Sequence, residues 1–266
     1  MNIIVCIKEI LDPEIPSDKF RLDTELKRVI PPAGIRPIIN PYDERAVELA
    51  IRVKETYGGK IMVLTVGVNA SISVVKHAIS MGADDGVIIA DQAFEGSDSF
   101  GIGHILAQAI KKIGSYDLIL CGREAADWDE GLVGPILAEN LSLSLVTFVK
   151  EIHVTETGLK VKRVALNAYQ VFHVPLPALI TVGQEVGRPR LPSGKGIILA
   201  ARKQLPVWNA QDINVDFSQI GVGAARRELV KLFIPKRERK CEIVEGETAS
   251  EAAVSLAGRL REIGAI

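Results

Sequence analysis

The loop Gly122–Gly134 combines glycines with one arginine and four acidic residues. It follows a strand-like segment, Tyr116–Cys121, and leads into a helix-like segment, Gly131–Leu141. Glycines allow backbone N–H groups to approach a phosphate, and a helix N-terminus favours negative charge. Four acids would repel a bare phosphate, so binding would have to use backbone groups and Arg123. The alternative, a surface turn with solvated acids, stays open on these residues alone.

A second candidate segment is Asp91–Ser99, which also follows a strand-like run and precedes a helix-like one. Ser97, Asp98 and Ser99 are residue types that accept hydrogen bonds from the first N–H groups of a helix. A helix cap with no further role is the alternative interpretation. The sequence contains no P-loop pattern and no complete dinucleotide-binding glycine pattern.

The histidines and cysteines form no recognisable catalytic or metal-binding pattern. Four histidines are scattered without a pair at ligand spacing, and three cysteines, Cys6, Cys121 and Cys241, are widely spaced without a CxxC motif. We therefore expect no metal site and no catalytic side chain. Any chemistry should come from a bound cofactor.

Composition excludes several classes of partner. The 266 residues carry a formal charge of −1, whereas nucleic-acid-binding proteins usually have a strongly basic face. No apolar run reaches the ~18 residues of a membrane span. We thus expect neither nucleic-acid binding nor membrane insertion. Unpaired cysteines and the lack of a recognisable leader lead us to expect a cytoplasmic protein.

Strand-like and helix-like periodicities alternate over the first 145 residues. This pattern predicts a Rossmann-like, doubly wound parallel sheet with helices on both faces, an α/β fold. In such sheets a ligand binds at the carboxyl ends of the strands, where the strand order reverses. The predicted strands are 3–7, 60–66, 86–90 and 116–121, and the predicted helices cover 44–57, the segment before Gly82, 97–113 and 131–141.

We expect residues 1–182 to form a nucleotide-binding α/β domain. Within it, residues 12–39 are an excursion with hairpin character, and 145–182 form antiparallel strands. Two of those strands, 145–154 and 159–174, would be joined at a Glu156-Thr157-Gly158 turn.

Residues 183–266 are expected to form a partner-recognition loop and an extended C-terminal arm. The arm should contain a strand-like segment, 229–234, and a helix from Ser250 to about Ile263 that Thr248 caps.

Several short segments together resemble one family, the β subunits of electron-transferring flavoproteins, over essentially the whole chain. Each segment alone is only weakly specific for this family, but the set of segments together is specific for it. They are Ile4–Ile10, Ile39–Asp43, Met81–Asp84, Asp117–Arg123, Val133–Pro135 and Pro177–Val182.

The resemblance implies a heterodimer in which the arm reaches around a larger α subunit. The β subunit would hold an adenine nucleotide, which is AMP in simple carriers. In electron-bifurcating members it is a second FAD that exchanges hydride with NAD(H), with ferredoxin and a partner dehydrogenase as the other redox partners. Residues 183–203 would match the arm that recognises the dehydrogenase.

Asp91–Ser99 looks like the DxAFxGxD[TS] stretch of bifurcating members, so FAD is favoured over AMP. Leu132 departs from the glutamine usual in the family. The cofactor-binding residues that the resemblance implies are Cys6, Asn40, Asp43, Val66, Phe94, Ser97, Asp98, Ser99, Gly122, Arg123, Glu124, Ala125, Asp129, Gly131, Leu132, Val133 and Gly134.

Overall fold

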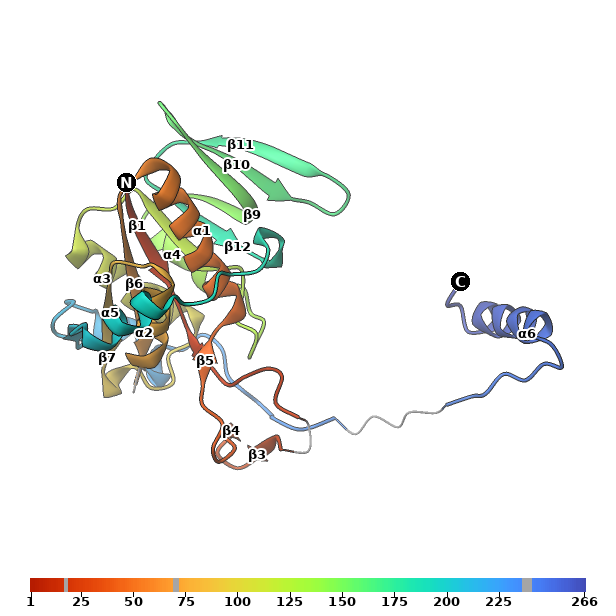
Figure 1. Cartoon of the computed structure of the whole chain (residues 1–266). Coiled ribbons are helices and arrows are strands. Elements are labelled where there is room, and N and C mark those ends of the chain that lie inside the picture. The colour runs from red at the N-terminus through yellow and green to blue at the C-terminus, as the bar shows by residue number, and fades with distance from the viewer. Residues whose placement is uncertain (17–18, 69–71, 236–240) are drawn as a thin grey trace.

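The computed structural model describes residues 1–16, 19–68, 72–235 and 241–266. Its centre is a nine-stranded sheet in the order β11-β10-β9-β12-β8-β1-β6-β7-β13 (Figure 1). All neighbours from β9 to β13 in this order pair in parallel. The strands are β1 (Asn2–Cys6), β6 (Lys60–Gly67), β7 (Asp85–Ala90), β8 (Leu118–Gly122), β9 (Ser144–Thr155), β10 (Gly158–Val164), β11 (Tyr169–Val174), β12 (Ala178–Val182) and β13 (Val207–Trp208).

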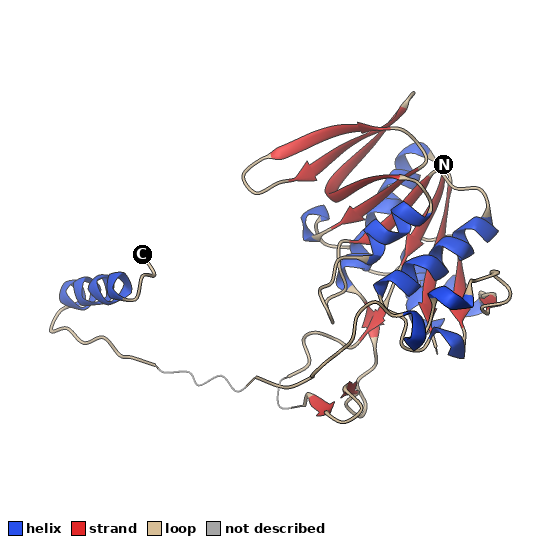
Figure 2. Cartoon of the chain, turned by 180° about the vertical axis from the view of Figure 1, so that it is seen from behind, coloured by secondary structure: helices blue, strands red, loops and turns tan. Residues whose placement is uncertain are grey.

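Helices cover both faces of the sheet, which confirms the doubly wound α/β fold (Figure 2). Buried side chains of α1, α2 and α5 belong to one apolar core, and those of α3 and α4 belong to the other. The helices are α1 (Pro41–Tyr57), α2 (Ile72–Met81), α3 (Ser99–Ile113), α4 (Val133–Asn140), α5 (Gly194–Arg202) and α6 (Ala249–Glu262).

The apolar composition of the strands explains this double cover. Along β1, Ile3 and Val5 point into the core beneath α1 and α2, whereas Ile4 and Cys6 point into the core beneath α3 and α4. A strand that is buried on both faces needs a continuous apolar run, not an alternating one. The short runs in the sequence therefore predicted the parallel sheet correctly.

The antiparallel region differs from its prediction in two ways. Residues 159–174 form two antiparallel strands, β10 and β11, because the chain turns back at exposed Leu166. Strand β12 is parallel to both β8 and β9, although 145–182 was expected to be antiparallel throughout. All five β12 residues are buried, as expected for a strand inserted within a parallel sheet.

The excursion at 12–39 contains the expected hairpin, in which β3 (Arg21–Asp23) pairs with β4 (Arg28–Ile30). A second small sheet joins β2 (Glu9–Ile10) to β5 (Ile38–Ile39), so the excursion leaves and re-enters beside the end of β1.

The C-terminal part begins on the sheet and then leaves it. After α5, β13 adds to the edge strand β7. The expected strand at 229–234 is wrong, because within the described ranges this segment pairs with no strand. Figure 1 shows α6 apart from the sheet, and none of its residues is buried. Within the described residues, no helix is long and apolar enough to cross a membrane.

Candidate functional site

The strand order reverses between β1 and β8. The chain runs from β1 through β6 to β7, and then returns across β1 to form β8 on the other side. The carboxyl ends of β1 and β8 therefore lie side by side at the switch point. Open α/β sheets bind their ligands in the crevice at this position.

Asp43, in the first turn of α1, joins these two strand ends. Its carboxylate accepts the N–H of Lys8 at 2.7 Å and the N–H of Gly122 at 2.9 Å. The side chain is buried, and burial raises the pKa of Asp43 to about 7 against the opposing effect of its hydrogen bonds. A Cβ at Gly122 would lie 2.4 Å from an Asp43 oxygen, so glycine permits this close approach.

Asn40, immediately before α1, fixes the start of the loop Gly122–Gly134. Its Nδ2 donates to the carbonyl of Glu124 at 2.8 Å, and its Oδ1 accepts the N–H of Ala126 at 3.2 Å. Asn40 is 1% exposed. Asn40 and Asp43 thus use side-chain hydrogen bonds to shape the loop from within the protein.

Arg123 lies between two aromatic rings at this edge. Its guanidinium carbon is 5.0 Å from the ring centre of Tyr42 and 5.6 Å from that of Phe148. It also pairs with Glu124 at 2.5 Å. These contacts hold the guanidinium in place through cation–π attraction and charge.

The end of the loop presents the N-terminus of α4. Leu132, immediately before the helix, makes no side-chain capping hydrogen bond. The N–H groups of Val133 and Gly134 are therefore the candidate donors to an anion, whereas the third helical residue, Pro135, carries no N–H. Gly131 has a φ of +65°, a backbone conformation that residues other than glycine rarely adopt. A Cβ at Gly134 would come within 2.7 Å of Thr181, so the helix packs tightly on the sheet.

Three of the four loop acids are paired with cations from different segments. The pairs are Lys8–Asp127 at 2.6 Å, Arg123–Glu124 at 2.5 Å and Arg227–Glu130 at 2.6 Å. The repulsion expected between the loop and a phosphate is therefore largely compensated. The sequence analysis missed Lys8 and Arg227; the place of Lys8 at a strand end could have identified it.

The segment Asp91–Ser99 holds a distant part of the chain, which we call the strap (residues 209–227). Four side chains from 91–104 accept backbone N–H groups along the strap. Phe94 is 3% exposed and packs in the core beneath it. The hydrogen bonds are Asp91 with Ala210 at 2.9 Å, His104 with Asp216 at 3.3 Å, Ser97 with Gly221 at 2.7 Å and Asp98 with Arg226 at 2.7 Å.

Ser99 connects this segment to the loop, because its hydroxyl donates to the carboxylate of Glu130. Asp98 also caps α3 by accepting the N–H groups of Phe100 and Gly101. The two segments that the sequence singled out thus meet at Glu130.

Cys6 and Val66 lie at the carboxyl ends of β1 and β6. Cys6 pairs in register with Cys121, and both thiols are buried. A hydrogen bond to Cys6, together with burial, raises the pKa of Cys121, which makes a reactive thiolate unfavourable.

The structure therefore gathers Cys6, Asn40, Asp43 and the predicted loop residues at the switch point. Ser99 reaches this group through Glu130, whereas Phe94 lies in the core and Ser97 and Asp98 bind the strap.

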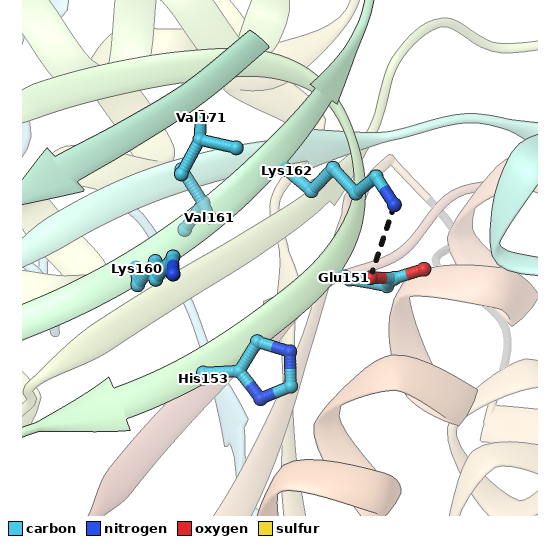
Figure 3. A pocket seen from close by; sticks show the side chains of 6 residues that line it. All are labelled: Glu151, His153, Lys160, Val161, Lys162 and Val171. Carbon is cyan, nitrogen blue, oxygen red and sulfur yellow. Dashed lines mark ion pairs between the residues drawn. The ribbon is translucent and has the colours of Figure 1, made fainter. Parts of the chain in front are cut away.

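A separate shallow recess lies on the β9–β10–β11 extension (Figure 3). Lys162 points toward Glu151 there, with 3.8 Å between their charged groups, and His153 and Lys160 lie across neighbouring strands. This recess shares no residue with the switch-point site.

Together, the fold and this edge define a doubly wound α/β protein with glycine-containing loops converging at the switch point. Residues 29–213 match the family model described as the electron transfer flavoprotein domain. The chain therefore belongs to the electron transfer flavoprotein family. Its relatives place it among the β subunits of that family.

One relative is the electron transfer flavoprotein subunit beta of Thermoanaerobacterium thermosaccharolyticum, 36% identical with 98% of each chain covered. A subunit of the same name from Clostridium acetobutylicum is 33% identical, again with 98% of each chain covered. The caffeyl-CoA reductase-Etf complex subunit CarD of Acetobacterium woodii is 32% identical, with 98% of each chain covered. Membership of this family implies flavin-related electron transfer and an α-subunit partner.

Proposed function

We propose that this chain is the β subunit of an electron-bifurcating flavoprotein and holds an FAD at the switch point between β1 and β8. NAD(H) would exchange hydride with this flavin. Electrons would then divide between ferredoxin and, through the FAD of the α subunit, a partner dehydrogenase. The name of one relative, a caffeyl-CoA reductase-Etf complex subunit, supports an assembly of this kind.

The observation that carries this proposal is the preformed loop Gly122–Gly134. It ends at a helix N-terminus without a side-chain cap, and its acids are largely paired. Glycines at 122, 131 and 134 bring the backbone close to the neighbouring elements. The N–H of Gly122 is donated to Asp43, so the proposed donors are the N–H groups of Gly131, Val133 and Gly134. This donor set fits the phosphates of an adenine nucleotide.

The protein residues would bind and orient the cofactor. Asn40 and Asp43 would hold the loop, and Arg123 would add a positive charge between its two rings. Glu124, Ala125, Asp129 and Leu132–Gly134 would line the cofactor. Bound flavin would supply hydride and single-electron transfer, for which the site needs no catalytic side chain.

A structural AMP in the same site is the alternative. One observation favours it: Ser97 and Asp98, which the family resemblance assigns to the second FAD, are hydrogen-bonded to the strap. In that case the chain would be a scaffold and docking module for a one-flavin carrier.

The exposed apolar segments suit contacts with partner proteins. In and beside α5, Leu191 is 88% exposed and Ile197, Ile198 and Leu199 are more than half exposed. Arg190, before this patch, is anchored to Glu48 and Glu55 of α1. We assign residues 183–203 to dehydrogenase recognition, and residues 228–266 to the α subunit. The expected cytoplasmic location remains a prediction.

The test is to co-express the chain with its α subunit, denature the purified complex and quantify FAD and AMP. About two FAD per heterodimer without AMP would support the bifurcating carrier. About one FAD and one AMP would establish the alternative and reject a flavin at this site. About one FAD and no AMP would reject a resident nucleotide in this chain.

A further inference from the structure

The strap brings a positive charge from the C-terminal part of the chain to the candidate nucleotide loop. Arg227, the last strap residue, pairs with Glu130 at 2.6 Å, and the same carboxylate accepts the Ser99 hydroxyl. Glu130 lies directly before Gly131 and close in sequence to the N-terminus of α4, where Leu132 makes no side-chain capping hydrogen bond.

The strap is built into the fold, so this charge has a defined place. Its apolar side chains Ala210, Ile213, Val215 and Ile220 are buried in the core with Phe94. Val222 packs over Gly96, where a Cβ would come within 2.3 Å of it. The backbone N–H of Arg226, the residue before Arg227, is held by Asp98 at 2.7 Å.

We propose that Arg227 is a positioning residue of the adenine-nucleotide site, where it holds Glu130 and cancels its charge so that the phosphates can bind. This inference rests on the proposed function, because it assumes that the loop binds an adenosine phosphate. It adds a residue from outside the predicted nucleotide-binding domain to the site.

The charges explain the effect. Without Arg227, the Glu130 carboxylate would face the phosphates without its cation, and like charges repel. The other two pairs, Lys8–Asp127 and Arg123–Glu124, use cations from the segment after β1 and from the loop itself. Only the Glu130 pair depends on the strap, so nucleotide binding and strap seating would favour each other reciprocally.

Arg226 provides a matched control. It has the same charge and is the adjacent residue, but its guanidinium lies 4.4 Å from the ring centre of Phe100. Arg226→Ala therefore changes the net charge as Arg227→Ala does without removing the partner of Glu130.

The experiment titrates AMP, FAD and adenosine into the nucleotide-stripped heterodimer by calorimetry. Wild type should bind AMP or FAD at this chain, and Arg227→Ala should weaken that binding about fivefold, as expected for a partly exposed pair. Adenosine, which lacks phosphate, should bind equally well to both proteins. Arg226→Ala should leave all three affinities unchanged. Glu130→Gln in the Arg227→Ala background should restore phosphate-dependent binding.

Two results would overturn the proposal. One is unchanged AMP and FAD affinity in Arg227→Ala. The other is an equal loss for adenosine and AMP that Glu130→Gln does not repair, because this would show a purely structural role. A wild-type chain that binds neither AMP nor FAD would instead reject the proposed function itself.

Discussion

In two regions of the molecule, the switch point and the sheet edge beside the strap, side-chain acceptors bind the backbone N–H groups of a loop. The two regions differ in how deeply these acceptors are buried. At the switch point, Asn40 and Asp43 bind backbone groups between two central strands, and both are almost completely buried. At the sheet edge, residues 91–104 bind the strap, a peripheral segment that adds four buried apolar side chains to the rim of the core beneath α3 and α4. The same hydrogen bonds should therefore support the whole fold in one region and only local order in the other.

The largest effect should come from Asp43→Asn. The amide can accept only one of the two N–H groups with its oxygen and turns a donor toward the other. An unsatisfied buried group of this kind costs about 3 kcal/mol of unfolding free energy, measurable by urea denaturation. Asp117→Asn is the control, because Asp117 accepts the N–H of Asn2 at the exposed opposite end of β1. An equal loss in the two variants would contradict the comparison.

The wild-type protein should show a pH dependence of stability at this site that Asp43→Asn lacks. The pKa of Asp43 is raised to about 7 by burial, so the native state binds this proton more tightly than the unfolded state. Stability from this group is present at low pH and is lost as pH rises toward 7. The difference between wild type and Asp43→Asn should therefore be larger at about pH 5 than at about pH 8. A difference that grows with pH would show that the ionised, doubly bonded carboxylate is preferred.

A smaller and local effect is expected for Ser97→Ala. This variant leaves the N–H of Gly221 without its acceptor, a loss of about 1 kcal/mol. Hydrogen exchange should show faster exchange in residues 219–227 with the protection of the central strands unchanged. Ser115→Ala, which removes an exposed hydroxyl at the other end of the sheet, should change neither region. Global loss of protection would mean that the strap is part of the cooperative core.

The smallest effect should be the response of the strap to acid. His104 accepts the N–H of Asp216 with Nε2, and burial lowers its pKa, with Asp216 opposing the shift and Lys111 adding to it. Its neutral form is fully present above the usual histidine pKa and is lost as pH falls through the lowered value.

The Asp216 amide should thus lose protection only as pH falls below the usual histidine range, relative to a His104→Gln variant measured at each pH. Glutamine keeps an acceptor but does not titrate. Parallel pH responses in the two proteins would exclude His104 as the cause.

The same contrast explains what the sequence could predict. Apolar runs and helical periodicity identified the parallel sheet, and the loop Gly122–Gly134 stood out by its glycines. Residues 209–227 gave no such signal, because the strap attaches through its own backbone N–H groups to side chains more than a hundred positions earlier. The sequence also did not predict that β12 would lie parallel between β8 and β9. An apolar run predicts a buried strand but does not determine which strands pair with it.

The way in which the strap is attached also limits how its sequence can vary. The bonds at Asp216 and Arg226 use the amide hydrogen, which every residue type except proline carries. Both positions should therefore exclude proline. Arg226 should accept wide variation in side-chain size and charge, whereas the Asp216 carboxylate also accepts the N–H of Ser218 and so favours an acceptor side chain. In contrast, the anchoring positions Asp98 and His104 need a specific acceptor, so substitutions should be tolerated more readily at Arg226 than at the two positions that hold the strap.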